Sequence, residues 1–393
     1  MAYKQNGITI VDDEGNWADR SFDSVSDISA TEVKITASDT AASDRFGAVS
    51  VGCGRIVVGS IFDDDAGSSS GSAYIYDLDG TNEIKITASD DAGGDSFGCA
   101  TAVGEGKIAI GAYNESGGGS LYIYDLNGTN EIKVRPSDAA SSDQFARYKI
   151  DIGCGKIVVG AHGNDDDGSS SGSAYIYDLD GTNEIKLTAS DAAASAFFGW
   201  SVTVGYGRIA VGAWNAGGNG AVYLYTLDGF EYKKLSNPDG TTGGRFGRSV
   251  DIGCGRIVVG ADNGTGGVDG SGSVYVYDLN GNYLDKISAS DGASGDQFGY
   301  GVAVGNGKIV VGAYTDDDDG SASGSAYIYD LDGTNEIKLT ASDAAGGDEY
   351  GEFVAVGSGK VVVGAKPNEA AYVYDLPENT DTYWENIIEG FRW

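Results

Sequence analysis

Residues 298–340 decide the fold: FGYGVAVGNGKIVVGAYTDDDDGSASGSAYIYDLDGTNEIKLT. Short runs of Val, Ile and Tyr alternate here with Gly, Asp and Ser, a pattern that is typical of short strands joined by turns. It predicts strands at residues 301–304, 308–311, 326–330 and 336–340. Gly305-Asn306-Gly307 and Asp332-Gly333 are expected to form tight hairpin turns. The stretch therefore predicts a four-stranded antiparallel meander.

The same unit of about fifty residues occurs seven times along the chain. Each copy begins with an aromatic residue that Gly follows in all copies but one: Phe46, Phe97, Phe145, Phe198, Phe246, Phe298 and Tyr350. Such a period is typical of β-propellers. The third strand of each copy carries large side chains on both faces, and radially stacked blades would cover both. The sequence therefore predicts an all-β, seven-bladed β-propeller with its tyrosines packed between blades.

The last copy supplies only three strands, and the third of them ends at Asp375. Residues 32–39 (EVKITASD) match the outer strand of the first copy at residues 83–90 (EIKITASD). We expect this N-terminal segment to complete the last blade and to close the ring, which removes an open apolar boundary. The predicted organisation is a leader at residues 1–30, a propeller at residues 31–376 and an aromatic tail at residues 377–393.

The repeated Phe-Gly, followed by Val-Val-Gly-Ala, makes the chain resemble the FG-GAP repeat family of integrin alpha-subunit propellers over about residues 32–376. In integrin-like repeats a calcium loop joins the first two strands, but here that connection is only Gly-x-Gly, as at Gly52-Cys53-Gly54. Those calcium ligands therefore have no counterparts in this chain. The leader, Ala2 to Asp12 with Gly15-Asn16-Trp17, resembles the opening of structural and tail-fibre proteins of marine cyanobacterial phages, which implies a virion protein.

The formal net charge of −34 repels phosphate backbones, so we expect no direct nucleic-acid binding. The N-terminus lacks the apolar core of a signal peptide, and no apolar run is long enough to span a bilayer, so we expect no membrane insertion. Cys53, Cys154 and Cys254 occupy the same slot in separate copies. Such positions lie too far apart to form disulfides, so the thiols are expected to be free.

Antiparallel geometry places the long connections between second and third strands, and those between blades, on one face. Both sets are acidic, whereas the residue that opens each second strand is basic and belongs to the opposite face: Arg55, Lys107, Lys156, Arg208, Arg256, Lys308 and Lys360. We therefore expect a strongly negative, loop-rich face. Three of its loops offer oxygen ligands that suit calcium: Asp63, Asp64, Asp65, Asp165, Asp166, Asp167, Asp316, Asp317, Asp318 and Asp319. Solvated turns with diffuse counterions are the alternative.

The sequence predicts binding rather than catalysis, because it contains no nucleophile elbow, phosphate loop or Cys/His cluster. We interpret His162, the only histidine, as a polar loop residue. Trp214, beside a Gly/Asn loop, is a candidate for stacking on a sugar or anchoring a protein, with core packing as the alternative. In the tail, Trp384, Phe391 and Trp393 are candidates for docking onto the propeller or a neighbouring subunit.

These observations predict a non-enzymatic structural or binding protein of a phage virion, in a tail, a fibre or a surface decoration. The propeller would then be made in the host cytoplasm and would bind other virion proteins and a host-surface glycan or protein. A calcium-dependent adhesin, secreted or displayed on a bacterial cell surface, is the first alternative. A polysaccharide-degrading propeller enzyme is the second.

Overall fold

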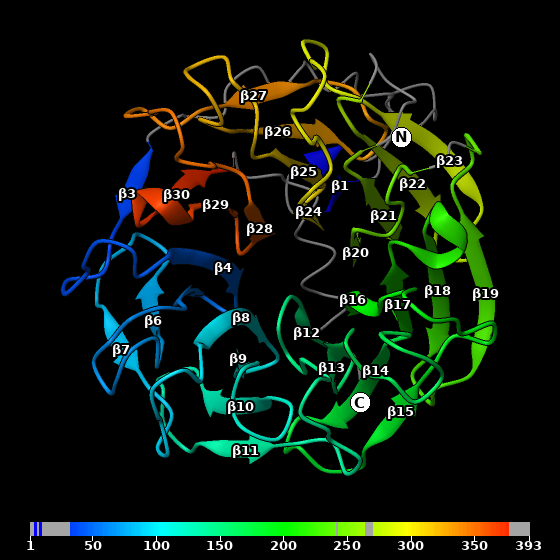
Figure 1. Ribbon diagram of the computed structural model, residues 1–393. Helices are drawn as coiled ribbons and strands as arrows, with labels where there is room; N and C mark the ends of the chain where they lie inside the picture. The colour runs from blue at the N-terminus through cyan, green and yellow to red at the C-terminus, as the bar shows by residue number, and fades with distance from the viewer. Residues whose placement is uncertain (1–3, 6–7, 10–31, 241–242, 264–269, 377–393) are drawn as a thin grey trace.

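The computed structural model describes residues 4–5, 8–9, 32–240, 243–263 and 270–376. Within these ranges, seven four-stranded antiparallel sheets surround a central axis as blades, which confirms the predicted fold (Figure 1). In each blade the first strand lies nearest the axis and the fourth lies at the rim. A separate pair of two-residue strands, β1 (Lys4–Gln5) and β2 (Ile8–Thr9), lies in the leader.

Six blades are formed by consecutive strands. The first blade contains β4 (Phe46–Gly52), β5 (Arg55–Ser60), β6 (Ser72–Asp77) and β7 (Ile84–Ile86). The second contains β8 (Phe97–Gly104), β9 (Lys107–Ala112), β10 (Ser120–Asp125) and β11 (Ile132–Val134). The third contains β12 (Ile150–Gly153), β13 (Lys156–Ala161), β14 (Ser173–Asp178) and β15 (Ile185–Leu187). The fourth blade contains β16 (Phe198–Gly205), β17 (Arg208–Ala213), β18 (Ala221–Thr226) and β19 (Glu231–Ser236). The fifth contains β20 (Ser249–Gly253), β21 (Arg256–Ala261), β22 (Ser273–Asp278) and β23 (Tyr283–Ile287). The sixth contains β24 (Val302–Gly305), β25 (Lys308–Ala313), β26 (Ser325–Asp330) and β27 (Ile337–Leu339). Two short 3₁₀ turns, η1 (Ala216–Gly218) and η2 (Lys366–Asn368), follow β17 and β29.

The seventh blade joins the two ends of the ring. It contains β28 (Phe353–Gly357), β29 (Lys360–Ala365) and β30 (Ala370–Asp375), and its outer strand is β3 (Val33–Ile35). β3 pairs antiparallel with β30, so that Lys34 lies opposite Tyr372. Glu32 also accepts hydrogen bonds from the backbone and hydroxyl groups of Ser342. The predicted closure by the N-terminal segment is therefore confirmed.

The predicted turn between the first two strands of a blade is a two-residue hairpin. In the sixth blade Gly305 pairs with Lys308, and both residues between them, Asn306 (φ 51°) and Gly307 (φ 74°), have positive φ. Positive φ at both central positions defines the hairpin turn whose twist matches that of the flanking strands. Cys53 occupies the same position in the first blade, with φ 48°. The slot shared by three cysteines is therefore a turn tip, and none of the three is in a disulfide.

Glycine is required where neighbouring blades touch. A Cβ atom on Gly59, in β5, would lie 1.9 Å from the carbonyl oxygen of Gly98 in the next blade, and Gly98 itself has φ +85°. The aromatic residue beside Gly98, Phe97, packs edge-on against Tyr122, with ring centroids 5.4 Å apart. Phe97 and Tyr122 are almost completely buried. The tyrosines of the third strands therefore belong to the core between blades, as predicted.

Candidate functional site: an axial pocket on the loop-rich face

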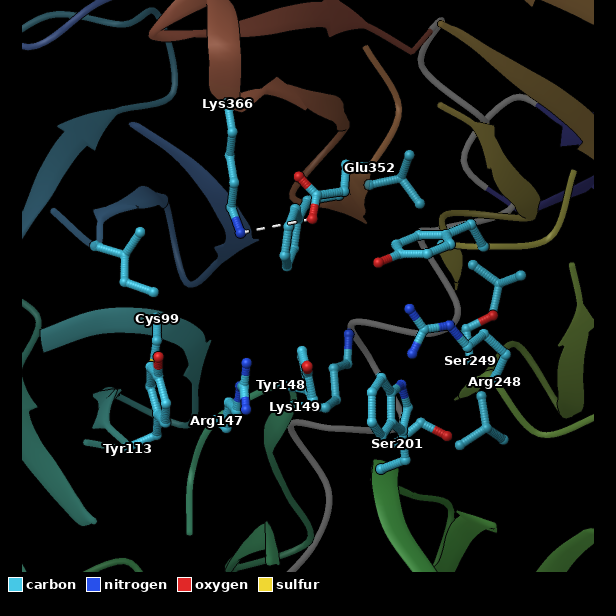
Figure 2. A pocket seen from close by; sticks show the side chains of 18 of the residues that line it. Cys99, Tyr113, Arg147, Tyr148, Lys149, Ser201, Arg248, Ser249, Glu352 and Lys366 are labelled. Carbon is cyan, nitrogen blue, oxygen red and sulfur yellow. Dashed lines mark ion pairs between the residues drawn. The ribbon is translucent and has the colours of Figure 1, made fainter. Parts of the chain in front are cut away.

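A cavity of about 310 Å³ lies on the central axis, at the end of the ring where the first strands begin and the second strands end. The long connections lie at this same end. Backbone hydrogen bonds join them, as from Phe97 to Ser70 and from Gly94 to Ser68. We call this end the loop-rich face and the cavity the axial pocket (Figure 2). Its lining comes from all seven blades: Arg45, Ile61, Phe62, Cys99, Tyr113, Arg147, Tyr148, Lys149, Trp200, Ser201, Arg248, Ser249, Val250, Tyr300, Gly301, Val302, Glu352, Phe353, Val354 and Lys366.

Much of this lining comes from two slots in the repeat. The first slot follows the aromatic-Gly pair and holds Cys99, Arg147, Trp200, Arg248, Tyr300 and Glu352. The second slot follows the end of the second strand and contributes Ile61, Tyr113 and Lys366. The residues that precede these slots, aromatic-Gly for the first and Gly-Ala for the second, repeat in nearly every blade, whereas the slots themselves vary. The framework is therefore constant, and the pocket carries what is particular to this chain.

Six of these side chains form a continuous stack of alternating cations and rings, which we call the axial arc: Tyr113, Arg147, Tyr148, Trp200, Arg248 and Tyr300. The guanidinium carbon of Arg147 lies 4.5 Å from the ring centroid of Tyr113 and 4.8 Å from that of Tyr148. Tyr148 stacks on Trp200 at 4.0 Å. Arg248 lies 4.3 Å from Trp200 and 4.4 Å from Tyr300. Arginine held between aromatic faces is a favourable and rigid arrangement.

Two side chains beside the axial arc, those of His162 and Cys99, are buried. His162 follows β13 at the start of a loop, as predicted, but it is buried with its ring 5.0 Å from Tyr148 and 4.8 Å from Trp200, so it is not an ordinary polar loop residue. Burial, together with the positive charges of Arg147 and Arg248, lowers the pKa of His162 to about 3. His162 is therefore a neutral packing residue. Burial also raises the pKa of Cys99 to about 11, so this thiol is not a nucleophile at neutral pH.

Trp214 lies beside the axial arc. It is half-buried and stacks on Phe197, with ring centroids 5.1 Å apart. With Trp200, Arg245 and Arg248 it lines a smaller cavity of about 200 Å³. Its indole Nε1 is buried, and none of the described residues accepts a hydrogen bond from it. The ring of Trp214 is thus used for packing against Phe197 and the guanidinium of Arg245, which is the alternative that the sequence left open.

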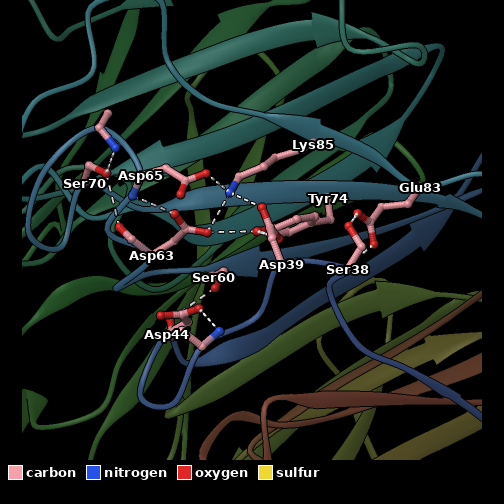
Figure 3. Close-up of polar contacts among 12 residues, drawn as sticks. Ser38, Asp39, Asp44, Ser60, Asp63, Asp65, Ser70, Tyr74, Glu83 and Lys85 are labelled. Atoms are coloured by element: carbon pink, nitrogen blue, oxygen red, sulfur yellow. Dashed lines mark hydrogen bonds and ion pairs between the residues drawn. The ribbon is translucent and has the colours of Figure 1, made fainter.

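The acidic loops meet lysine side chains from the outer strands (Figure 3). In the first blade the ammonium of Lys85 lies 2.7 Å from Asp39 and 2.9 Å from Asp63, and it also contacts Asp65. The carboxylates of these three aspartates have oxygen atoms within 4.8 Å of one another. Burial lowers the pKa of Lys85, but its hydrogen bonds to the three carboxylates outweigh this effect and raise it above the ordinary value. Asp64 points elsewhere and accepts a hydrogen bond from the backbone N–H of Ser69.

The other two predicted calcium loops differ from the first. In the sixth blade Lys338 contacts Asp291, Asp316 and Asp318, while Asp317 and Asp319 are exposed. In the third blade Lys186 contacts Asp138 and Asp166, and Asp165 accepts a hydrogen bond from the backbone of Ser170, while Asp167 is exposed. Among the residues that the structure describes, only the first loop brings three carboxylates within 4.8 Å of one another.

Each outer-strand lysine also pairs with an aspartate of the preceding blade. This pairing was not predicted from the sequence, although both residues recur in every copy of the repeat. An aspartate ends the outer-strand motif of the preceding blade and pairs with the outer-strand lysine of the next. These interblade ion pairs are Lys85–Asp39, Lys133–Asp90, Lys186–Asp138, Lys234–Asp191, Lys286–Asp239, Lys338–Asp291 and Lys34–Asp343. A tyrosine of the third strand donates a hydrogen bond to each of these aspartates, as Tyr74 does to Asp39. We call this ring of contacts the interblade belt.

The loop-rich face is not uniformly negative, as the sequence predicted, but has an acidic rim and a basic centre. Negative charge lies in the loops at the rim of the loop-rich face, but the centre of that face is basic, with Arg147, Lys149 and Arg248 in the pocket. On the opposite face most of the basic residues pair with the aspartate that ends the third strand of their own blade: Arg55–Asp77, Lys107–Asp125, Lys156–Asp178, Lys308–Asp330 and Lys360–Asp375. That face is therefore partly neutralised.

Trp384, Phe391 and Trp393, the docking candidates of the tail, lie outside the described residues, as does most of the leader. Nowhere in the described ranges does a helix reach the length and apolar character that crossing a membrane requires. Within the described residues none of the four cysteines is in a disulfide, and only Cys53 is exposed.

A family model described as FG-GAP repeat matches seven segments, at residues 30–76, 81–124, 129–177, 182–225, 230–277, 284–329 and 334–374. Among solved structures, the crystal structure of the computationally designed Ika8 protein is similar, with a TM-score of 0.52. The sequence identity is 11%, and the similarity covers 87% of this chain and 99% of that chain, so it concerns the fold alone. No curated protein matches the chain.

Proposed function

We propose that this protein, which belongs to the FG-GAP repeat family, is a non-enzymatic binding protein that recognises its partner through the loop-rich face. The observation that carries the proposal is the axial pocket, where the variable side chains of the repeat converge on a rigid ring. Pre-organised loops and pockets on a stiff scaffold bind with little loss of conformational freedom.

The setting that we propose is a phage virion, in which the protein serves as a tail, fibre or surface-decoration component in host attachment or assembly. This setting is supported by the resemblance of residues 2–17 to structural proteins of marine cyanobacterial phages. Mass spectrometry of purified particles should detect the protein at a fixed copy number. Its absence from particles, together with its presence on bacterial cells, would support the adhesin alternative instead.

The chemistry of the axial pocket supports binding rather than hydrolysis. A glycosidase needs two carboxyl groups that flank the scissile bond. Among the described residues that line this pocket, Glu352 is the only carboxylate, and it lies 3.8 Å from the ammonium of Lys366. The single carboxylate is thus part of an ion pair.

The choice of face can be tested with a bulky polymer attached to a cysteine. Cys53 is exposed at a turn on the face opposite the loops, so the unmodified protein already carries one attachment point. A second attachment point is created by Ser68→Cys, in an exposed loop of the loop-rich face, combined with Cys53→Ser. The polymer at residue 68 should abolish binding of the labelled propeller to host cells, whereas the polymer at Cys53 should not. Equal binding by both conjugates would disprove the choice of face.

We also propose that the loop of the first blade binds calcium through Asp39, Asp63 and Asp65. Its support is the approach of their oxygens to within 4.8 Å, and calcium would have to displace the ammonium of Lys85. Addition of a chelator should then lower the melting temperature, and Asp63→Asn combined with Asp65→Asn should remove that effect. An unchanged melting curve in chelator would contradict calcium binding and leave Lys85 as the only cation of this loop.

A further inference from the structure

In the axial arc, aromatic rings cover the flat faces of the two guanidinium groups but not their edges. Aromatic rings lie against Arg147 and Arg248, which leaves the in-plane N–H groups of each guanidinium available. Arg147 uses one of these donors on the side-chain oxygen of Gln144. The Nε of Arg248 lies 3.6 Å from the buried carboxylate of Asp262. The remaining donors form the planar fork that matches a carboxylate with two parallel hydrogen bonds.

The pocket also concentrates cations that lack an acidic partner. Most lysines and arginines in the described ranges lie within ion-pair distance of a carboxylate, as expected for a chain with 59 acidic and 25 basic residues. In those same ranges Arg45, Arg147, Lys149, Arg208, Lys233 and Arg256 have no carboxylate within that distance, and the first three line the axial pocket. Unpaired positive charge in a cleft with low-dielectric walls attracts an anion strongly.

Hydroxyl groups complete the set of polar atoms. The third-strand tyrosines of the interblade belt donate to carboxylates, as Tyr327 does to Asp291. In the part of the chain that the structure describes, by contrast, no group hydrogen-bonds to the hydroxyls of Tyr113, Tyr148 and Tyr300, and none of these is a buried unsatisfied atom. These three hydroxyls are therefore accessible, and each can both donate to and accept from a ligand.

The chemistry of this lining selects one class of ligand. The fork matches a carboxylate, the free tyrosine hydroxyls can donate to and accept from the hydroxyls of a sugar, and the aromatic side chains suit the apolar face of a sugar ring. The volume of about 310 Å³ is at the lower end for ligand pockets and suits one or two sugar rings. An acidic peptide would also satisfy the cations, so hexaglutamate serves as the competing ligand in the test.

We infer that the axial pocket binds a saccharide that carries a carboxylate, that is, a uronic acid residue of a host-surface glycan. The carboxylate lies against the edge of Arg147, and the ring hydroxyls contact Tyr113, Tyr148 and Tyr300. Arg248, on the other side of Tyr148 and Trp200, adds to the positive potential. Lys149 contributes to the positive potential. This inference rests on the proposed function, because it names the ligand class of the same face.

The test is titration calorimetry with a galacturonic acid trisaccharide, with its methyl ester as the control, in which each carboxylate loses its charge and gains a methyl group. The full-length protein should bind the acid at least about tenfold more tightly than the ester. Arg147→Gln should lose about tenfold or more in affinity for the acid and little for the ester. Because Arg147 has no carboxylate partner in the described structure, its replacement leaves no buried acid unpaired. Lys149→Gln serves as a second variant should the first fail to fold.

Arg256→Gln is the matched control, because Arg256 opens a second strand on the opposite face and also lies outside ion-pair distance of the described carboxylates. It should retain the affinity of the unmodified protein. Equal losses in Arg147→Gln and Arg256→Gln, equal binding of acid and ester, or binding of hexaglutamate but not of the trisaccharide would each overturn the inference.

Two further readouts separate the failure of this inference from that of the proposed function. If Arg147→Gln and Lys149→Gln still bind host cells normally, the uronate assignment is wrong but the binding function stands. If the bound trisaccharide is cleaved, with release of reducing ends or of an unsaturated uronate, the pocket assignment stands but the protein is an enzyme.

Discussion

Ala146 adopts a backbone conformation that most other copies of the repeat give to glycine. Its φ is 63°, while the residues in the same slot include Gly98 at 85° and Gly199 at 82°. The left-handed region costs an alanine roughly 1–2 kcal/mol because its Cβ crowds the following carbonyl. Ala146 is therefore a point of strain beside Arg147, at the edge of the axial pocket.

This strain gives a prediction with opposite signs at two equivalent positions. Ala146→Gly should stabilise the fold by roughly 0.5–1 kcal/mol, since the relief of strain exceeds the added freedom of the unfolded chain. Gly98→Ala should destabilise it by more than that, because the new Cβ would lie 2.2 Å from the carbonyl oxygen of Ser72. Urea denaturation measures both changes. Destabilisation by both substitutions would contradict the strain at Ala146.

Asp91 is a second residue whose native environment lowers the stability of the fold at neutral pH. Both of its carboxylate oxygens are buried, and no described residue gives them a hydrogen bond of normal geometry. Burial, with a smaller contribution from the charge of Asp95, raises the pKa of Asp91 to about 6. Because the folded state binds this proton more tightly than the unfolded state, the contribution of Asp91 to stability increases as the pH falls from about 7 towards 4.

Replacement of Asp91 should remove this dependence. Asp91→Asn should raise the free energy of unfolding at pH 7 by on the order of 1 kcal/mol, after allowance for solvent screening, and should have little effect at pH 4. Thermal denaturation between pH 4 and 7 checks this, with Asp167→Asn as the control, because Asp167 is exposed and takes no part in the interblade belt. A difference between Asp91→Asn and the unmodified protein that does not change with pH would contradict the raised pKa.

At the scale of the element, β3 is a short strand with a large role. It contains only Val33–Ile35, yet Ile35 is buried against the first and last blades, and Lys34 reaches Asp343 at 2.6 Å. Its removal would expose the edge of β30 and break the interblade belt at one position. Stacked units need each neighbour to bury a continuous core, so this loss affects the whole ring.

Two deletions isolate the contribution of β3. Deletion of residues 1–38 should lower the melting temperature strongly and promote aggregation through the exposed edge of β30. Deletion of residues 1–31, which retains Glu32 and β3, is the matched control and should change the melting temperature far less. Scanning calorimetry compares them. Similar melting temperatures for the two deletions would mean that β3 does not hold the ring closed.

At the scale of the whole molecule, charge repulsion competes with the interblade belt. The chain has a formal net charge of −34, and its ion pairs are mostly partly exposed. Exposed pairs contribute little individually, whereas like charges that are spread over a ring repel one another across its full width when the Debye length is about 30 Å, at 0.01 M salt.

Moderate salt should therefore stabilise the protein. An increase of NaCl from about 0.01 M to 0.2 M shortens the Debye length to below about 10 Å and should raise the melting temperature. Replacing NaCl by an equal ionic strength of KCl should give the same shift, which separates screening from specific ion binding. A fall in melting temperature with added salt would show that the belt contributes more than the repulsion costs.

The ring could be predicted from sequence because each local signal occurs in every copy. The aromatic-Gly pair, the two-residue turns and the match between residues 32–39 and 83–90 all point to one architecture. The axial pocket could not be predicted in this way. Arg147 and Arg248 are basic residues about a hundred positions apart, and only the packing of the third, fourth and fifth blades brings them to either side of Tyr148 and Trp200.

The acidic loops illustrate the same limit. Their aspartates are evident in the sequence as candidate ligands, but the ammonium that lies among them comes from an outer strand, and the third carboxylate comes from the preceding blade. Lys85 is 46 residues from Asp39 along the chain, although the two side chains are in contact. Side chains at equivalent positions become neighbours across blades, and a pattern within one copy does not contain that information.

The pairing of β3 with β30 also orders events during synthesis. β3 leaves the ribosome first among the strands of the ring, and its partner follows more than three hundred residues later. At the ribosome's rate of roughly 5–20 residues per second, β3 waits for tens of seconds while six blades form. A prematurely terminated polypeptide never acquires that partner and ends in an unsealed, protease-sensitive boundary. The pairing of β3 with β30 therefore favours complete chains, because only a polypeptide that includes the last blade can close into a stable ring.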